Sequence, residues 1–125
     1  MDQDLAAFYD RLLAVLRRPT ARKGRWQLLE CVPAWEGNGS SDDFVAFAWE
    51  GPGGERLVVA VNQAPTQGQC FVRLPFGDLA RRQWRLQDQL GPASYERDGD
   101  DLLARGLYLD APPWQASVFC LDPGP

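Results

Sequence analysis

The sequence predicts an all-β protein: an antiparallel Greek-key-type β-sandwich that carries one N-terminal amphipathic α-helix. Three observations support this class. Apolar residues recur with a helical period near the N-terminus, short apolar runs follow one another after Gly24, and turn signals rich in glycine or proline separate these runs. A chain of 125 residues is long enough to bury one core. The predicted division places the helix in residues 1–20 and the sandwich in residues 21–125.

The helical segment has a stripe of large apolar side chains on one face. Its members are Leu5, Phe8, Tyr9, Leu12, Leu13 and Leu16. Asp2 or Asp4 is placed to cap the helix, and Pro19 is placed to end it. Burial of each large side chain stabilises a fold by about 1.5–3 kcal/mol, so six of them are costly to leave in water. We expect the helix to pack on the sandwich or to self-associate through Leu5, Phe8, Leu12 and Leu16.

The first strands include a hairpin at the centre of the predicted sheet. Residues 25–31 form one strand, and residues 44–50 and 56–62 flank a Gly-Pro-Gly-Gly turn at residues 51–54. Both flanking runs are apolar at consecutive positions, which is typical of strands covered on both faces. We therefore expect these two strands to lie centrally rather than at an edge.

The second half of the chain predicts a series of further short strands. They are residues 69–74, 83–90, 95–97 paired with 101–104, 106–110 and 115–121. Asp98-Gly99 is a strong type I′ hairpin signal, since both positions of that turn need positive φ. The rigid pair Pro112-Pro113 predicts a sharp hairpin corner between the last two strands. Trp114 follows this corner and is expected to seal one end of the core.

The charge distribution opposes a nucleic-acid function. The net charge is −4, and residues 1–25 hold six basic and three acidic side chains, which leaves −7 on the remainder. Cations at the end of a helix are favoured by its dipole, so the basic cluster indicates a helix terminus. No apolar run of the sequence is long enough to cross a bilayer. We expect neither nucleic acid nor a membrane as a partner.

The three cysteines, Cys31, Cys70 and Cys120, lie in apolar runs of the predicted strands. They have no CxxC spacing and the sequence contains no histidine, so the residue types that build a zinc site are missing. A buried free cysteine behaves as a small apolar residue. We expect structural thiols in a reducing, cytoplasmic environment and no metal ion.

The usual catalytic constellations are missing from the sequence as well. Without histidine there is no Ser-His-Asp triad and no Cys-His pair. The glycine-rich residues 51–54 lack the lysine that a phosphate loop requires. The acidic cluster at residues 98–101 lacks the distal glutamate of a calcium loop, and carboxylates at a hairpin tip do not face each other across a cleft. No catalytic residue and no cofactor are therefore predicted.

Tryptophan supplies the one candidate for ligand binding. Four of the five tryptophans have the phase of core residues along their strands; these are Trp26, Trp49, Trp84 and Trp114. Trp35 instead lies in a loop beside Glu36 and Asn38, whose polar groups can bind hydroxyls, and a flat aromatic ring can stack on a sugar ring. Trp35, Glu36 and Asn38 are the predicted carbohydrate contact. The alternative is that Trp35 packs over a sheet edge or against a neighbouring domain.

Several segments, in the same order, resemble the end of an enzyme of the α-amylase superfamily of glycoside hydrolases. Residues 8–18 resemble the last helix of the catalytic barrel in that family, and residues 23–29 resemble the turn and first strand that follow it. Residues 56–62 resemble a family strand that ends in asparagine. The remaining similar segments are residues 45–49, 84–88 and 107–121. The resemblance spans nearly the whole chain and identifies it with the C-terminal β-domain.

The resemblance implies a non-catalytic accessory domain that stabilises an α-amylase-type glycoside hydrolase acting on α-glucans in carbohydrate metabolism. The catalytic carboxylates of such enzymes lie on an upstream barrel, which is the implied partner. One alternative is a carbohydrate-binding module that contacts α-glucan through Trp35. A second alternative is a small free-standing interaction protein that uses the helix face.

Overall fold

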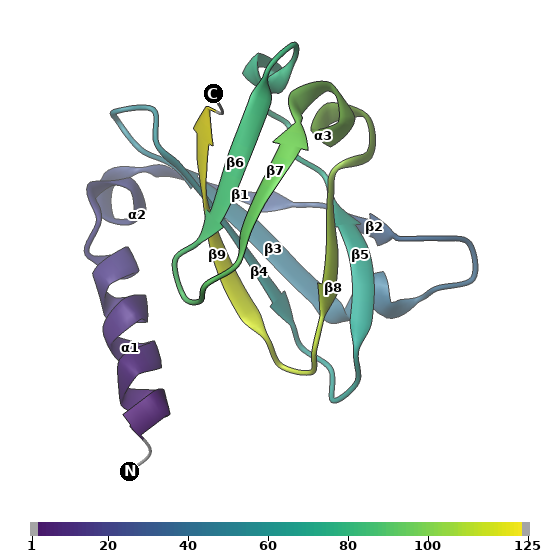
Figure 1. Cartoon of the computed structure of the whole chain (residues 1–125), viewed down its shortest axis with the longest axis horizontal. Helices are drawn as coiled ribbons and strands as arrows, with labels where there is room; N and C mark the ends of the chain where they lie inside the picture. Colours follow the sequence, from purple (N-terminus) through teal and green to yellow (C-terminus); the bar gives the residue numbers. More distant parts are fainter. Residues whose placement is uncertain (1–2, 124–125) are drawn as a thin grey trace.

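Two antiparallel sheets pack face to face, and a helix lies against the outer face of the larger sheet (Figure 1). The computed structural model describes residues 3–123, with side chains from residue 6 onward. The six-stranded sheet has the order β1 (Arg25–Leu29), β3 (Phe44–Glu50), β4 (Arg56–Asn62), β9 (Ala116–Pro123), β6 (Gln83–Asp88) and β7 (Ser94–Asp98). The three-stranded sheet has the order β2 (Cys31–Pro33), β5 (Gly68–Val72) and β8 (Leu107–Ala111). The predicted all-β sandwich class is confirmed.

The main core lies between the two sheets and follows the alternation of side chains along each strand. In β6, for example, Trp84 and Leu86 are buried while their neighbours are exposed, as the sequence predicts. The largest fully buried members of this core are Phe119, Leu79, Leu86, Leu102, Leu107, Val58 and Val72. Leu79 lies in the short helix η2 (Gly77–Leu79), and a similar turn, η1 (Ser40–Asp43), precedes β3.

The predicted central hairpin is confirmed. β3 and β4 pair along their whole length, from Phe44 opposite Asn62 to Glu50 opposite Arg56, and the glycine-rich turn closes them. Both faces of β4 are buried because one side meets the other sheet and the opposite side meets the N-terminal helix. The continuous apolar run of residues 57–61 therefore has a structural explanation.

The N-terminal helix folds onto the sandwich. α1 (Gln3–Leu16) packs Phe8, Leu12 and Val15 against the outer face of β4 and β9. The Arg11 side chain donates a hydrogen bond from Nε to the carbonyl oxygen of Leu90, at 2.9 Å. The predicted stripe is therefore divided, because the side chains on its other side point to solvent; these are Tyr9, Leu13 and Leu16. The side chain of Leu5 and the predicted cap Asp2 lie outside the described residues.

Pro19 does more than separate the helix from the strands, since it begins a second short helix, α2 (Pro19–Lys23). Proline fits the first turn of a helix, where its missing N–H would have no partner in any case. Thr20 in α2 is buried and donates to Glu55 at 2.8 Å, which fastens this segment to the β3–β4 turn.

The predicted hairpin at Asp98-Gly99 is wrong. Residues 101–104 do not form a strand but belong to a helix, α3 (Gly99–Arg105), and Asp98 precedes it with a φ of −71°. Gly99 is needed for close packing, because a Cβ there would lie 1.6 Å from the carbonyl oxygen of Leu79. Two acidic residues in the first turn and an arginine in the last turn favour the helix. The Asp-Gly pattern reflects only local backbone preference, whereas the packing of Gly99 on Leu79 determines that a helix begins here.

The predicted Pro112-Pro113 hairpin is also wrong. β8 pairs with β5 in one sheet and β9 pairs with β4 and β6 in the other, so this segment carries the chain from one sheet to the other. Trp114, which was expected to seal the core, has a φ of 61° and is 64% exposed. Trp26 is likewise exposed instead of buried, and among the strand tryptophans only Trp84 lies in the main core. The alternation of residues along a strand indicates which side chains share a face, but it does not indicate whether another element covers that face.

The three thiols of the described chain are free, with Cys70 and Cys120 buried and Cys31 partly buried. Burial raises the pKa of the Cys120 thiol to about 11. No helix within the described residues has both the length and the apolar character needed to span a membrane.

Candidate functional site

Two exposed and two half-buried large apolar side chains adjoin one another on the outer face of the six-stranded sheet. Trp26 of the edge strand β1 lies opposite Trp49 of β3, and Leu28 lies opposite Phe47. We call these four residues the apolar face. The rings of Trp26 and Phe47 are 5.8 Å apart and those of Phe47 and Trp49 are 5.3 Å apart, so the aromatic members form one continuous surface.

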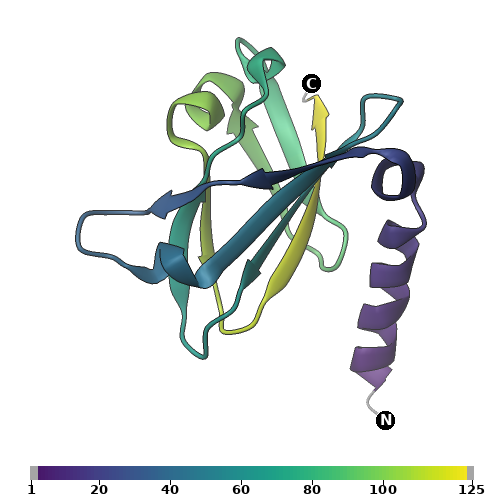
Figure 2. The same cartoon turned by 180° about the vertical axis from the view of Figure 1, so that it is seen from behind.

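The apolar face is exposed because α1 does not cover it. In Figure 2, α1 lies to one side of the sheet while β1 runs across it from α2. Trp26 is 54% exposed and Leu28 is 63% exposed, which is unusual for neighbouring large apolar residues. A contiguous exposed apolar patch of this kind marks an interaction surface more often than a solvent face.

Charged side chains lie at the end of the same strands but on the opposite face of the sheet, because Arg25, Glu50 and Arg56 alternate with Trp26, Trp49 and Leu57. Glu50 accepts hydrogen bonds from Arg25 and Arg56, both at 3.2 Å. Arg56 also forms a two-pronged pair with Asp78, at 2.8 and 2.9 Å, and this guanidinium lowers the pKa of the Asp78 carboxyl below its ordinary value. These ion pairs therefore lie at one end of the space between the two sheets, where Arg56 lies over the Phe76 ring at 4.4 Å, and they do not border the apolar face.

The predicted carbohydrate contact lies elsewhere, on the long loop before η1. Trp35 is 53% exposed and Glu36 is exposed, as a ligand contact would require. Asn38, however, is used within the protein: its amide donates to Gln69 at 2.9 Å, and its carbonyl oxygen accepts from the backbone N–H of Ser40 at 2.9 Å. Asn38 therefore anchors the loop to β5, and Trp35 and Glu36 remain as predicted contacts.

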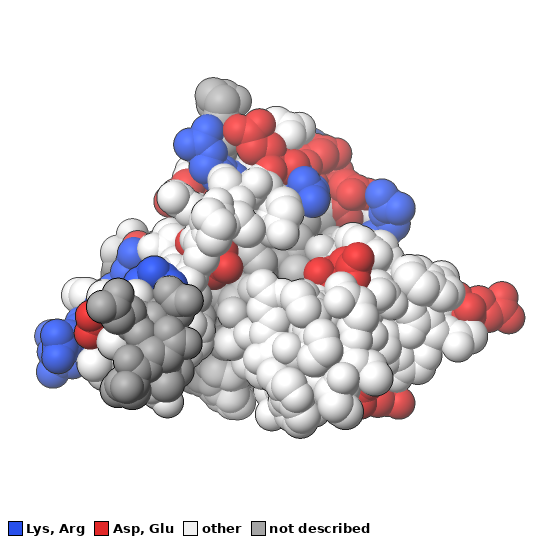
Figure 3. All heavy atoms as spheres, turned by 60° about the horizontal axis from the view of Figure 1, so that its bottom comes forward, with Lys and Arg blue, Asp and Glu red and all other residues white. Residues whose placement is uncertain are grey.

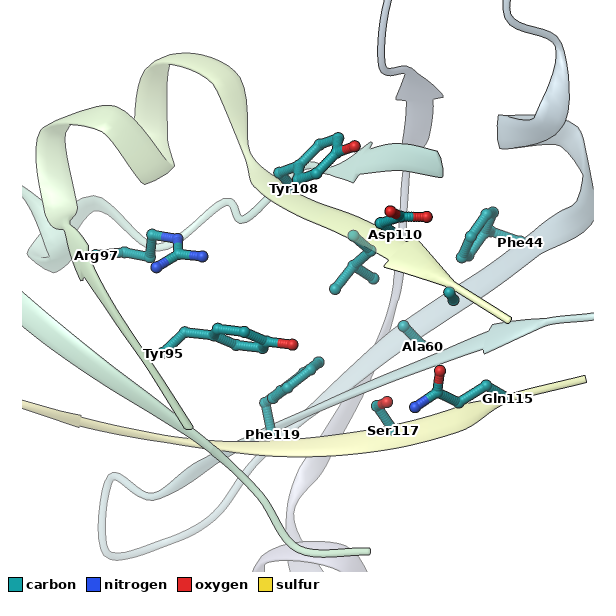
Figure 4. A pocket seen from close by; sticks show the side chains of 11 residues that line it. Phe44, Ala60, Tyr95, Arg97, Tyr108, Asp110, Gln115, Ser117 and Phe119 are labelled. Atoms are coloured by element: carbon teal, nitrogen blue, oxygen red, sulfur yellow. The ribbon is translucent and has the colours of Figure 1, made fainter. Parts of the chain in front are cut away.

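A second surface was not predicted from the sequence: a cleft of about 250 Å³ where the two sheets separate. Aromatic residues of four strands line it, namely Phe44, Tyr95, Tyr108 and Phe119, but Tyr108 alternates with the buried Leu107 and Leu109, so its ring lies outside the cleft against Phe71. Its polar side chains include Arg97, Gln115 and Ser117, whereas Asp110 lines its margin and directs its carboxylate to the outer face of the smaller sheet (Figure 4). The cleft exists because β7 and β8 are edge strands of different sheets, so no ladder closes the space between them.

The cleft adjoins an end of the sandwich that carries little charge. Residues 57–72 and 111–121 contain no charged side chain. Figure 3 shows this end as a broad uncharged surface with acidic side chains at its margins. Trp114 projects from the β8–β9 connection in this region, next to Gln115, which lines the cleft.

The carboxylate of Asp110 is held by two glutamines on the outer face of the smaller sheet. Its Oδ1 accepts hydrogen bonds from Gln67 at 2.8 Å and Gln69 at 3.0 Å, and these bonds lower the pKa of Asp110. Gln69 in turn accepts from Asn38, so the loop that the sequence singled out is bonded to Asp110 through Gln69. Across the cleft, Arg97 lies over the Tyr95 ring at 5.0 Å.

The arrangement is suited to binding rather than to acid–base chemistry. Asp110 is the one carboxylate among the residues that line the cleft, whereas glycoside hydrolysis uses a facing pair. Among the described residues, no group of three or more His, Cys, Asp or Glu side chains is placed to hold a metal ion. The paired positions Tyr95/Arg97 and Tyr108/Asp110 were visible in the sequence as aromatic and charged residues two apart. That β7 and β8 would lie on two sides of one opening between the sheets was not visible.

Together these observations define a two-sheet antiparallel β-sandwich with an N-terminal helix, an exposed apolar face and an open edge. The fold is similar to part of the crystal structure of the putative alpha-N-acetylgalactosaminidase of Bacillus halodurans C-125, with a TM-score of 0.53 and 20% sequence identity. The match covers 81% of this chain but 21% of that chain, so the similar region is a small part of the neighbour. No protein-family model matches the sequence, and no curated protein matches it. This likeness establishes the fold, and the resemblance to the α-amylase superfamily stays a prediction.

Proposed function

We propose that this chain is a non-catalytic accessory domain of a glycoside hydrolase and that its apolar face docks onto the catalytic domain. The observation that carries the proposal is the exposure of Trp26 and Leu28 beside Phe47 and Trp49 on one sheet face. The structural neighbour, a glycoside hydrolase by its name, supports the class because the similar fold occupies only 21% of that much longer chain.

The energetics favour a permanent partner over a solvent-exposed face. Burial of a large apolar side chain is worth about 1.5–3 kcal/mol, so covering Trp26 and Leu28 alone would stabilise a docked arrangement by several kcal/mol.

The finer assignment, an α-amylase-type parent acting on α-glucans, is supported by the resemblance of the ordered segments that end with residues 107–121. In that arrangement α1 is the last barrel helix. Its two faces agree with this role, since Phe8, Leu12 and Val15 meet the sandwich while Tyr9, Leu13 and Leu16 are left for another domain.

The test begins with the coding sequence around this chain, which we expect to specify a glycoside hydrolase catalytic domain. In the complete protein, Leu28→Glu should lower by several degrees the temperature at which hydrolytic activity is lost. The chain by itself should be unaffected within about 0.5 kcal/mol, because Leu28 is largely exposed there. Trp35→Glu is the matched control, since it places the same charge at a similarly exposed apolar site outside the face.

Three outcomes would overturn the proposal. One is that no catalytic domain is specified next to this chain. The second is that Leu28→Glu and Trp35→Glu leave the inactivation temperature equally unchanged. The third is that Leu13→Glu abolishes association with a separate protein while Leu28→Glu leaves that association intact, because the free-standing interaction protein that uses the helix face would then be the better description.

A further inference from the structure

We propose that the outer face of the three-stranded sheet binds a neutral oligosaccharide. On this face Phe71 of β5 lies opposite Tyr108 of β8, and two residues along the same strands Gln69 lies opposite Asp110. We call these four residues, together with Gln67, the outer site. The choice of a saccharide as the ligand rests on the proposed function, whereas the outer site itself stands on the geometry of the described residues.

The outer site faces solvent because the side chains of β5 and β8 alternate between the core and the outside. Cys70 and Val72 of β5 are buried in the main core, as are Leu107 and Leu109 of β8. The side chains between them therefore point away from the core. Tyr108, on the edge strand of this sheet, is 40% exposed.

Hydrogen-bonded polar side chains form a row across the outer site. Oδ1 of Asp110 accepts from Gln67 at 2.8 Å and from Gln69 at 3.0 Å. Oε1 of Gln69 accepts in turn from Asn38 at 2.9 Å. Within the described residues, no hydrogen bond ends on Oδ2 of Asp110 or on Oε1 of Gln67. These two oxygens can accept from ligand hydroxyls, and because their side chains are already held in position, binding costs little side-chain entropy.

The aromatic pair lies directly beside this polar row. Residues two apart along a strand are separated by about 7 Å, so a sugar ring stacked on Tyr108 would direct its edge hydroxyls toward Asp110. The rings of Tyr108 and Phe71 pack at 5.4 Å, and the Arg105 guanidinium lies over Phe71 at 6.0 Å. Tyr108 is therefore the stacking surface, and Phe71 supports it.

The loop that contains Trp35 extends the outer site beyond β5. Asn38, which binds Gln69, also donates from its backbone N–H to the carbonyl oxygen of Trp35 at 3.1 Å. The polar row thus runs from this loop over β5 to β8, and the segments at its two ends carry exposed aromatic residues, Trp35 and Tyr108. Because neighbouring strands alone lie about 4.8 Å apart, a row over these three segments is longer than one sugar ring and suits an oligosaccharide.

The charges at the outer site favour a neutral ligand. An anionic sugar would bring its carboxylate near the carboxylate of Asp110. A cation would be attracted by Asp110 but would meet the Arg105 guanidinium, which already lies over the aromatic pair. A chain of neutral hydroxyl groups meets neither repulsion and matches the amide and carboxylate oxygens of the row.

The experiment is an amide chemical-shift titration of the ¹⁵N-labelled chain with maltotetraose, cellotetraose and chitotetraose. Trigalacturonate is the anionic comparison, and choline is the cationic one. We expect at least one neutral tetrasaccharide to shift residues 35–38, 67–71 and 108–110 with a Kd on the order of 1 mM. The two charged probes should bind more weakly by at least about tenfold.

Variants of the outer site should separate stacking from hydrogen bonding. Tyr108→Ala removes the stacking ring and Asp110→Ala removes the carboxylate, and each should weaken binding about tenfold. Tyr108→Phe keeps the ring and should weaken binding about threefold or less. Trp114→Ala is the matched control, since it removes an equally exposed aromatic side chain outside the outer site and should leave the titration unchanged. Unchanged amide shifts elsewhere in each variant show that it is folded.

Three results would overturn the proposal. One is that no neutral tetrasaccharide shifts the outer site at concentrations far above about 1 mM, and another is that a charged probe binds equally well. The third is that Trp35→Ala abolishes binding while Tyr108→Ala leaves it intact, because the loop alone would then be the site. Leu28→Glu should leave the titration unchanged, so that a failure of docking and a failure of sugar binding are distinguishable.

Discussion

The side chain of Asn62 links the two sheets and also binds the β8–β9 segment that crosses between them. Its side chain is fully buried, at 0% exposure. The amide Nδ2 donates to the carbonyl oxygens of Thr66, Ala111 and Pro112 at 3.0–3.1 Å, and Oδ1 accepts from the backbone N–H of Ala64 at 3.1 Å. One side chain thus ties the end of β4 to the β4–β5 turn and to the start of the β8–β9 crossing.

Replacing this amide by an apolar group of similar volume, Asn62→Leu, removes these bonds while it leaves little cavity. The two N–H groups of the amide contribute about 0.5–1.5 kcal/mol each, and the buried N–H of Ala64 would lose its partner at about 1–3 kcal/mol. The expected loss in free energy of unfolding is therefore about 2–6 kcal/mol, a large part of the roughly 5–15 kcal/mol that a domain possesses.

The assay is urea unfolding followed by tryptophan fluorescence, because Trp84 is buried and reports on the core. Gln63→Leu is the control: it makes the same kind of substitution at the adjacent, exposed position and should cost less than about 0.5 kcal/mol. If Asn62→Leu lowers the free energy of unfolding by less than about 1 kcal/mol, the hydrogen bonds of Asn62 contribute little to stability and the reasoning is refuted.

Two further predictions follow from single contacts. Gly99→Ala should lower the free energy of unfolding by at least about 2 kcal/mol, because the added Cβ would collide with a backbone carbonyl. The control Gly53→Ala, where the added Cβ meets open space, should change it by less than about 1 kcal/mol. Equal urea unfolding midpoints for the two variants would contradict the close packing under α3. The second concerns acid stability. The pKa of Asp78 is lowered by Arg56 from its ordinary value of 3.8, so this pair stabilises the fold above that pH and the contribution is lost as the pH falls through the lower folded-state pKa. Between pH 5 and pH 2 the free energy of unfolding should therefore fall less in Asp78→Asn than in the unchanged protein. The difference should be below about 1 kcal/mol, because the pair is partly exposed. Parallel plots of unfolding free energy against pH for the two proteins would contradict this.

Much of the fold could be predicted from local pattern. The β3–β4 hairpin has its predicted bounds because its glycine-rich turn and its doubly apolar strands agree with each other. The errors occurred where the local signal and the tertiary contact disagree. Asp98-Gly99 has the composition of a hairpin turn, but the close packing of Gly99 on the Leu79 backbone selects a helix. Pro112-Pro113 predicts a change of chain direction but does not indicate which strands it connects.

The candidate sites show the same division. Trp35 was found because it interrupts a polar loop, and it is indeed exposed. The cleft lined by Tyr95, Leu109 and Phe119 was missed because these residues come from different strands, two of one sheet and one of the other, which lie side by side only after the sandwich has closed. Trp26 was assigned to the core because its phase matches its strand, and phase does not reveal that β1 lies at an edge.

The sequence alone determined the class of fold, the helix and the central strands, since these depend on the periods of 3.6 and 2 in which apolar residues recur. It also provided the family resemblance, which depends on the order of segments. Only the tertiary structure decided which half of the helix stripe is covered, that residues 106–119 cross between sheets, and that a cleft opens where they do. These features depend on which strand becomes the neighbour of which, and strand pairing is a long-range property that no local window of the chain contains.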